Sequence, residues 1–386
     1  MFRIFIVIST LNLICATFVY SETQLLTYFK DTEYELNVYK IKGISPGPTL
    51  MIIGGIQGDE PGGYLSADLY ADMALEKGSL IVVPRANLLS IIKHRRLINK
   101  DMNRQFSITA KQHSYEDKVV EILEELITES DYLLNLHEGS GFYSDHWENS
   151  MINPMRFGQS IIADTDQYKT KDGRTLRLGN IARTVAANVN NRIENSGHHF
   201  KFNNHRTFDN NTKHPEQRRS ATYFALSYHD IPAFGIETSK EIHNIETKIK
   251  YQTMIINEFI KQLGLISPNP KITLERPALK YMIVSVNGAD KIVRNSEILR
   301  VNIGDIISIS KVEANYPRGL TVDILEKGNL SDLHKNFELT KPLKAIVRKD
   351  GVNCGQIKIN INDINGTGKK LPKEYKLKSI REDITI

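Results

Sequence analysis

The sequence predicts an α/β protein whose mainly parallel, mixed sheet is followed by one or two small all-β domains. Up to about residue 263, short apolar runs alternate with longer amphipathic segments, as strands and helices alternate around a parallel sheet. Beyond residue 270, strand-like runs recur at roughly ten-residue spacing with turn residues between them, which is typical of all-β structure. A length of 386 residues is enough for two or three domains.

The first part opens with an alternating segment, residues 34–43, which we expect to form an exposed strand at a sheet edge. Residues 49–54 are almost entirely apolar, as in a strand covered on both faces. Residues 64–76 then carry a helical pattern with one apolar face. The other expected strands are 78–84, 132–136 and 231–236, and the other expected helices are 115–129, 176–194 and 240–263.

The stretch 264–270 contains two prolines with Ser and Asn, so we expect a domain boundary there. The α/β domain then spans residues 22–267, and residues 271–341 form a β-rich domain. Residues 342–386 are either a small sandwich-like β module of their own or the last strands of the preceding domain. The strands expected in this part are 281–286, 298–301, 306–309, 320–324, 344–347 and 354–361.

The N-terminus has the composition of a secretory signal peptide, predicted over residues 1–21. Arg3 supplies one positive charge, an apolar stretch follows, and Ser21 is a small residue near the expected cleavage site. The apolar stretch is short for a membrane span and lacks a basic flank on its far side, so we expect no stable transmembrane anchor. After cleavage Cys354 is the one remaining cysteine, and an exported protein without disulfides fits a bacterial periplasm.

The overall composition is that of an ordinary globular protein, with 40% apolar and 25% charged residues. The net charge of +5 is mild and would favour an anionic polymer or surface as a partner. We expect no nucleic-acid partner, because no block of Lys and Arg is long enough to indicate one.

The glycine-rich turn 54–63 follows the first buried strand and carries Gln57 and Glu60, three residues apart. It has the H-x-x-E form of a metal-ligand turn, with Gln57 where a histidine is expected. His137 ends another buried strand and would be the third ligand of a zinc site with one position open for water. Open α/β sheets bind ligands at such strand ends, which favours this interpretation. The alternatives are a glycine-rich turn with an incidental acid, and competition from the other histidines for a metal.

Three further features matter beside this turn. Asn103 and Arg104 form a pair that can grip a carboxylate, although as an isolated dipeptide the pair means little. The segment His94-Arg95-Arg96 could stabilise a developing oxyanion or be a solvated basic loop. Glu237 ends an apolar strand, where a carboxylate either caps the helix that follows or acts as a general base.

Taken together, these features resemble the funnelin-type zinc metallocarboxypeptidases. The order is an H-x-x-E turn, then D-x-N-R-x-F at residues 101–106, then a histidine and a strand-end glutamate. Three features point to one group within this family: the Gln-for-His exchange, the signal peptide and a β-rich tail that contains VEANYPRGL at 312–320. The chain is then similar to the periplasmic peptidoglycan D,L-carboxypeptidases that set helical cell shape in spiral bacteria. The resemblance covers nearly the whole mature chain.

The resemblance implies an N-terminal carboxypeptidase-like α/β/α domain and a specific reaction. These enzymes hydrolyse the D-Glu–meso-diaminopimelate bond of the muropeptide tripeptide stem, leave a dipeptide and release meso-diaminopimelate. It also implies one Zn²⁺ per chain, held by Gln57, Glu60 and His137. The β domains are candidate contact surfaces for other cell-shape proteins.

The remaining roles also follow from the resemblance. Glu237 would be the general base, and Arg96 would stabilise the oxyanion, with the adjacent Arg95 as the alternative. Asn103 and Arg104 would read the terminal carboxylate of the substrate.

The Gln-for-His exchange has chemical consequences of its own. A neutral amide donates less charge than imidazole, so the metal should remain a stronger Lewis acid but be held less tightly. Asp59 or Glu138 could orient His137 through a hydrogen bond.

Two other functions fit parts of the sequence. One is a deacylase of N-acylamino acids, related to succinylglutamate desuccinylase and aspartoacylase, which would share the metal turn and the Asn-Arg pair. Export and the β-rich tail argue against it. The other is a non-catalytic peptidoglycan-binding scaffold with a decaying metal site, against which the retention of Glu60, His137, Arg104 and Glu237 argues.

Overall fold

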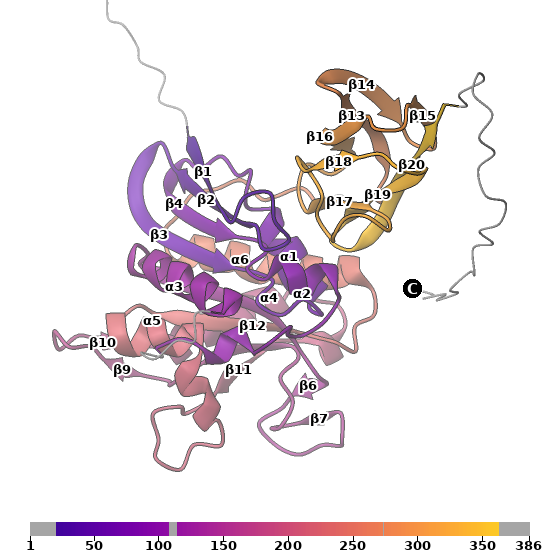
Figure 1. Cartoon of the computed structure of the whole chain (residues 1–386). Coiled ribbons are helices and arrows are strands. Elements are labelled where there is room, and N and C mark those ends of the chain that lie inside the picture. The colour runs from indigo at the N-terminus through magenta and orange to yellow at the C-terminus, as the bar shows by residue number, and fades with distance from the viewer. Residues whose placement is uncertain (1–20, 108–113, 273, 363–386) are drawn as a thin grey trace, which may run out of the picture.

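The computed structural model describes residues 21–107, 114–272 and 274–362 of the chain. These residues form an α/β region that ends near residue 266 and a C-terminal β region, residues 279–361, which lies apart from the large sheet (Figure 1). The signal peptide predicted for residues 1–21 lies outside the described residues, apart from Ser21.

The α/β region is built on an eight-stranded sheet in the order β1-β2-β4-β3-β5-β12-β8-β11. The strands β4, β3, β5 and β12 run parallel to one another at its centre, and β8 and β11 are also a parallel pair. The pairs β1–β2, β2–β4 and β12–β8 are antiparallel, so the sheet is mixed and mainly parallel, as predicted. The bounds are β1 Glu22–Tyr28, β2 Leu36–Lys42, β3 Ser45–Ile53, β4 Lys77–Val83, β5 Tyr132–Gly139, β8 Ser160–Ala163, β11 Lys201–Asn204 and β12 Ala233–Ser239.

The prediction of an exposed edge strand at residues 34–43 is wrong. This segment is β2, which pairs with β1 on one side and β4 on the other, and Leu36, Val38 and Ile41 are buried. The edge strand is β1, which escaped prediction because its side chains are mostly exposed on both faces and show no alternation.

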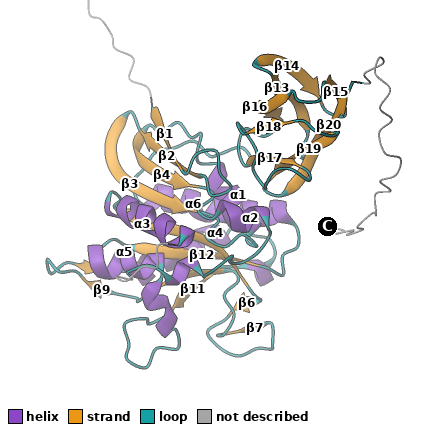
Figure 2. Ribbon diagram, viewed as in Figure 1, coloured by secondary structure: helices purple, strands orange, loops and turns teal. Residues whose placement is uncertain are grey.

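Helices cover both faces of the sheet, as the α/β/α prediction requires (Figure 2). The central strands are apolar on both faces and so need cover on both. In β3, Leu50 and Ile52 belong to one hydrophobic core, and Met51 and Ile53, which point the other way, belong to the second. The first core packs against α1 Pro61–Asp68, α4 Leu178–Asn190 and α6 Ile245–Gln262, and the second packs against α3 Tyr115–Thr128 and α5 Ala221–His229. Shorter elements are α2 Leu88–Ile92, the 3₁₀ turns η1 Met102–Arg104, η2 Ser196–His198 and η3 Pro215–Arg219, and the strand pairs β6 Phe142–Tyr143 with β7 Ile152–Asn153 and β9 Tyr168–Lys169 with β10 Thr175–Leu176.

The ends of these helices follow from local sequence. Ser114 and Asp117 form a reciprocal capping box at the start of α3, and Asn244 caps α6 by accepting a hydrogen bond from the Thr247 amide. Helix α1 starts at Pro61, directly after Glu60, and ends at Asp68, so it is shifted toward the metal turn relative to the predicted 64–76.

The C-terminal β region consists of two four-stranded sheets, ordered β14-β13-β16-β18 and β15-β20-β19-β17. The boundary expected between residues 341 and 342 falls between β18 and β19, yet β19 and β20 pair with the earlier strands β17 and β15. The described strands favour the alternative in which this piece completes the preceding domain, because all eight enclose one hydrophobic core. The bounds are β13 Leu279–Val286, β14 Ala289–Arg294, β15 Ile298–Val301, β16 Ile306–Ala314, β17 Leu320–Ile324, β18 Asn336–Glu338, β19 Leu343–Lys349 and β20 Val352–Ile361.

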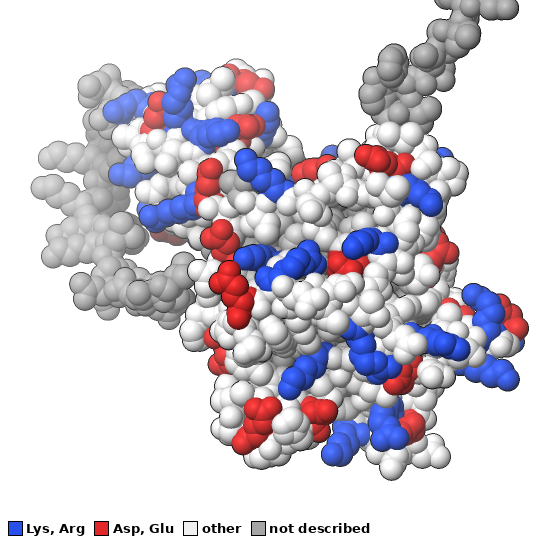
Figure 3. All heavy atoms as spheres, turned by 180° about the vertical axis from the view of Figure 1, so that it is seen from behind, with Lys and Arg blue, Asp and Glu red and all other residues white. Residues whose placement is uncertain are grey.

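The surface carries both signs of charge. On the face seen from behind, Lys and Arg side chains lie interspersed with Asp and Glu over both regions (Figure 3). Among the residues that the structure describes, no helix combines the length and the apolar composition needed to cross a membrane.

Candidate active site

The carboxyl ends of β3, β5 and β12 bring the predicted site residues to one edge of the sheet. Gln57 and Glu60 lie in the turn after β3, His137 lies near the end of β5, and Glu237 lies in β12. His137 and Glu237 are register partners in parallel strands, so their side chains leave the same face of the sheet. This is the edge at which open α/β sheets bind ligands.

The turn that carries Gln57 and Glu60 depends on a close backbone contact at Gly58. A Cβ atom on Gly58 would lie 2.1 Å from the carbonyl carbon of Ser90 in α2, so the turn tolerates no side chain there. The Gly58 amide also donates a hydrogen bond to the Arg95 carbonyl, at 3.1 Å. The metal turn therefore rests directly on α2 and the residues that follow it.

The three predicted metal ligands converge on one point. The Nδ1 atom of His137 lies 3.0 Å from Oε1 of Gln57 and 3.0 Å from Oε2 of Glu60. All three side chains are buried, with Gln57 3%, Glu60 2% and His137 5% exposed. An amide oxygen, a carboxylate and an imidazole nitrogen that meet in this way fit a divalent cation with further positions left for water or substrate.

The site combines two usual ligand types with an amide. In the part of the chain that the structure describes, no group of three His, Cys, Asp or Glu side chains is placed to hold a metal. The third donor beside His137 and Glu60 is the side-chain oxygen of Gln57.

Asp101 holds the amide of Gln57 in place. The Nε2 atom of Gln57 donates to both carboxylate oxygens of Asp101, at 3.2 and 3.3 Å, which turns Oε1 toward His137. Asp101 also accepts the Asn103 amide at the start of η1. Asp101 opens the D-x-N-R-x-F motif, and the motif alone predicts no role for it.

Other carboxylates nearby have different partners from those expected. Asp59 pairs with Lys240 at 2.7 Å, and Glu138 accepts the Gly62 amide and pairs with Lys248. The second ring nitrogen of His137 instead faces the amide nitrogen of Asn103, at 3.4 Å. The Glu138 backbone amide donates to Oε2 of Glu60, at 3.1 Å, and so helps to orient that ligand.

Protons and metal compete for this group of side chains. Burial by itself lowers the pKa of His137, but the hydrogen bond and charge of Glu60 outweigh it and raise this pKa above its ordinary value. A metal that binds Nδ1 must therefore displace a proton that Glu60 helps to hold.

Arg96, rather than Arg95, reaches the site. Its guanidinium donates to Oε1 of Glu60 at 3.2 Å and to Asp101 at 3.3 Å, and it lines the cavity. Burial lowers the pKa of Arg96, but the charges of Glu60 and Asp101 outweigh this and raise it, so the group stays cationic. Arg95 is exposed and contributes its backbone carbonyl to Gly58.

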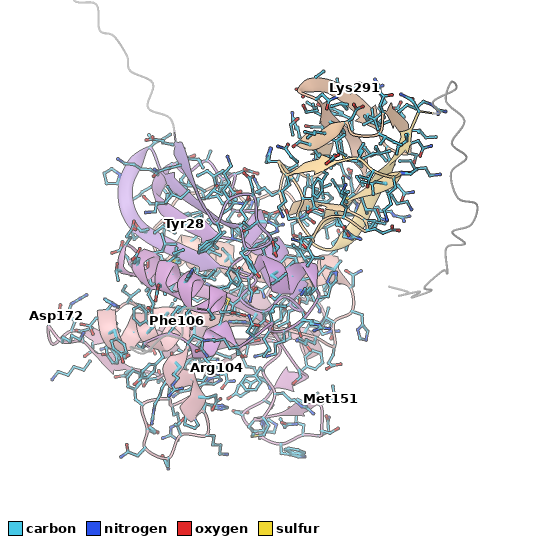
Figure 4. The ribbon with its side chains drawn as sticks, viewed as in Figure 1. Tyr28, Arg104, Phe106, Met151, Asp172 and Lys291 are labelled. Carbon is cyan, nitrogen blue, oxygen red and sulfur yellow. The ribbon has the colours of Figure 1, made fainter. Side chains whose placement is uncertain are left out.

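Asn103 and Arg104 lie side by side on the wall of the same cavity. The Asn103 side-chain oxygen accepts the Ala221 amide at the start of α5, at 3.1 Å, and Arg104 donates to the Asn103 carbonyl, at 2.8 Å. Figure 4 shows Arg104 in the lower half of the α/β region, below Phe106 of the same motif. The segment is therefore fixed to the core while the Arg104 side chain remains half-buried.

Glu237 lies half-buried on the cavity wall. Burial raises the pKa of its carboxyl to about 7, and the charge of Glu60 adds to the rise, while His137 and Arg96 oppose it. A carboxylate whose pKa lies near the working pH is suited to accept and return a proton.

The cavity has a volume of about 300 Å³ and receives side chains that the sequence analysis did not select. Lys240 adds a cation, and Phe157, His205 and Thr222 line the wall. No local pattern marks these residues, because they come from the loops after β7 and β11, from the short helix α5 and from the residue that follows β12. A larger cavity, about 440 Å³, lies between the α/β and C-terminal β regions, but the converging ligands lie in the smaller one.

The comparisons with known proteins agree with this architecture. Residues 19–279 match the profile of the family described as carboxypeptidase controlling helical cell shape, catalytic. The structure of tripeptide-bound cell shape determinant Csd4 from Helicobacter pylori matches with a TM-score of 0.53 at 17% identity, over 88% of this chain and 100% of that one. The mDAP-bound form of the same D,L-carboxypeptidase matches with a TM-score of 0.52 at 18% identity, over 82% and 97%. Comparison with the curated proteins finds no match.

The family defines a zinc-type carboxypeptidase, a hydrolase. The chain belongs to the family of carboxypeptidases that control helical cell shape. This confirms the family that the sequence analysis inferred from Gln57, Glu60, His137 and their neighbours.

Proposed function

We propose that the protein is a periplasmic peptidoglycan D,L-carboxypeptidase. It hydrolyses the D-Glu–meso-diaminopimelate bond of muropeptide tripeptide stems, releases meso-diaminopimelate and leaves a dipeptide on the glycan, and so shapes the cell. The observation that carries the proposal is the convergence of Gln57, Glu60 and His137 in a cavity that Glu237 and Arg104 also line. Family membership and the similarity to a structure described as tripeptide-bound support the substrate class.

We propose that one Zn²⁺ binds to Oε1 of Gln57, the Glu60 carboxylate and Nδ1 of His137. These donors suit zinc, apart from the amide, which is a weaker ligand than the usual imidazole. When bound, zinc would lower the pKa of a water molecule to about 7 and would act as a Lewis acid toward the scissile carbonyl. The weaker third ligand predicts a metal that chelators remove readily.

The roles of the remaining side chains follow from their charge and position. Arg104 and Asn103 bind the terminal carboxylate of the substrate through charge-assisted hydrogen bonds. Arg96 places its positive charge beside the developing oxyanion. Glu237 accepts a proton from the attacking water and returns it to the leaving amine.

Incubation of the mature protein with muropeptide tripeptides tests the proposal. We expect release of meso-diaminopimelate, identified by mass, which a chelator stops and added zinc restores. Glu237→Gln should remove turnover while zinc stays bound, whereas Glu121→Gln, at an exposed position of α3, should change neither. Near-normal turnover by Glu237→Gln, or turnover that a chelator leaves unchanged, would contradict the mechanism.

A further inference from the structure

The C-terminal β region touches the α/β region at the elements that support the metal turn. The turn between β19 and β20, Asp350-Gly351, and the segment before β17 that contains Arg318 reach α1 and α2. Figure 1 shows this end of the β region above α1 and α2. The family profile ends at residue 279 and so does not extend over these contacts.

An ion-pair cluster joins the two regions. Arg85, only 8% exposed, donates to Asp350 at 2.6 and 3.0 Å and to Asp68 of α1 at 2.8 and 3.1 Å. Arg318 donates to the same Asp68 at 2.8 Å and binds Asp72 through two bonds of 2.7 Å. Two-bond pairs between guanidinium and carboxylate groups have a fixed geometry. The pairs made by Arg85 are also buried, so separating the two regions there would leave buried charges without a partner.

A second contact leads from the β region toward the metal ligands. A Cβ atom on Gly351 would lie 2.7 Å from the Ile92 carbonyl, at the last residue of α2, and 2.6 Å from Nε2 of His94. Ser90, two residues earlier in α2, makes the contact with Gly58, which lies between Gln57 and Glu60. Helix α2 is therefore in contact with both the β19–β20 turn and the metal turn.

The residues after α2 complete the connection. The Arg95 carbonyl accepts the Gly58 amide at 3.1 Å, and Arg96 donates to Glu60 at 3.2 Å. The residues before α2 also bind the metal turn, because the Ala86 and Asn87 amides donate hydrogen bonds to the carbonyls of Gly54 and Gly55. The segment 85–96 is thus hydrogen-bonded to the metal turn both before and after α2.

We propose that the C-terminal β region acts as a clamp on this segment, and that Asp350 and Gly351 are positioning residues for the metal turn. The β region then contributes to metal binding and turnover through the backbone of α2, without any residue of its own in the cavity. Two regions joined by a linker can move relative to each other. Here the two-bond ion pairs restrict that motion, because they attach α1 and the residue Arg85 before α2 to the C-terminal β region.

Two glycines give a matched test. Gly351 and Gly288 both have φ near +85°, and both lie in turns of the β region, but a Cβ on Gly288 would meet nothing within 4 Å. Alanine therefore introduces the same backbone strain at both positions and pushes on α2 only at Gly351. A second variant, Asp350→Asn, removes the negative charge opposite Arg85. Asparagine tolerates the positive φ of this position as aspartate does. Its control is Asp290→Asn, at an exposed position of the same region.

The first measurement is hydrogen exchange in the full-length, chelator-treated protein, followed in a peptide that contains the Gly58 amide. We expect exchange to be at least fivefold faster in Gly351→Ala than in wild type, and unchanged within twofold in Gly288→Ala. Asp350→Asn should lie between the two, and Asp290→Asn should match wild type. This measurement requires neither bound zinc nor turnover, so it is independent of the proposed function.

The second measurement is zinc affinity by competition with a chelating dye. Gly351→Ala should bind zinc at least fivefold more weakly than Gly288→Ala, and its kcat at saturating zinc should fall more than its KM rises. Equal exchange at Gly58 and equal zinc affinity in the two alanine variants would overturn the proposal. The proposal would also be overturned if both alanine variants increased exchange at Gly58 to the same degree, because general destabilisation of the β region would give that result.

Discussion

Lys248 is predicted to stabilise the protein by neutralising Glu138 beneath the metal turn. Glu138 is 3% exposed, accepts the Gly62 amide at the start of α1 and pairs with Lys248 of α6. Lys248→Met keeps most of the side-chain volume but leaves the carboxylate without its cation. Removing one partner of a buried ion pair costs about 3–5 kcal/mol.

The cost should depend on pH. Burial raises the pKa of Glu138 above its ordinary value, and the positive charge of Lys248 limits that rise, so the substitution raises the pKa further. An acid with a raised folded-state pKa stabilises the folded protein only while it is protonated, and this stabilisation is lost as pH rises through the folded pKa. The gap in stability between variant and wild type should therefore be largest at high pH, where Glu138 is ionised in both proteins, and should shrink as pH falls toward about 4.3, the pKa of an unfolded glutamate.

Urea unfolding at pH 8 and pH 5 measures the loss of stability in the variant and its dependence on pH. Lys250→Met is the matched control, because Lys250 is exposed on the same helix and its substitution should change stability by no more than about 0.5 kcal/mol. Adding Glu138→Gln to Lys248→Met should recover part of the loss. Equal effects of the two lysine substitutions, or a gap that widens at low pH, would refute the reasoning.

Three further predictions concern the cavity. Arg104→Ala should lower kcat/KM about 10- to 100-fold for substrates with a free terminal carboxylate, the equivalent of one charge-assisted hydrogen bond; an unchanged preference over amide-capped substrates would contradict this role. Arg96→Met should move the acid limb of the pH profile of kcat/KM to higher pH, because the Arg96 charge opposes the rise in the pKa of Glu237; a limb that stays in place or moves down would argue against the pairing. Asp101→Ala should weaken zinc binding about 10- to 100-fold in dye competition, because it frees the Gln57 amide to rotate, and affinity equal to wild type would exclude that support.

The central strands and the position of the candidate site residues at their ends could be predicted from the sequence because both rest on local patterns. The runs that became β3, β5 and β12 are apolar on both faces, and polar residues follow each of them, so their ends mark the site. The strands β15 and β17 have the predicted bounds for the same reason, since turn residues delimit them on both sides.

The elements that escaped prediction lack such patterns. The strands β8 and β11 are only four residues long, and α5 has nine residues with apolar side chains around most of its surface, so neither period stands out. These elements supply Thr222 and the neighbourhood of His205, which is why one wall of the cavity was not anticipated. Contacts such as Arg85 with Asp350 join residues 265 positions apart, and only the folded arrangement of both regions reveals them.

The central claim is that Gln57, Glu60 and His137 bind one metal ion together. A crystal structure of the zinc-loaded protein, with anomalous scattering measured at the zinc absorption edge, tests it most directly. We predict a single strong peak within about 2.0–2.2 Å of Oε1 of Gln57, a Glu60 carboxylate oxygen and Nδ1 of His137. Zinc bound to other side chains, or a Gln57 amide turned away from the ion, would contradict the account.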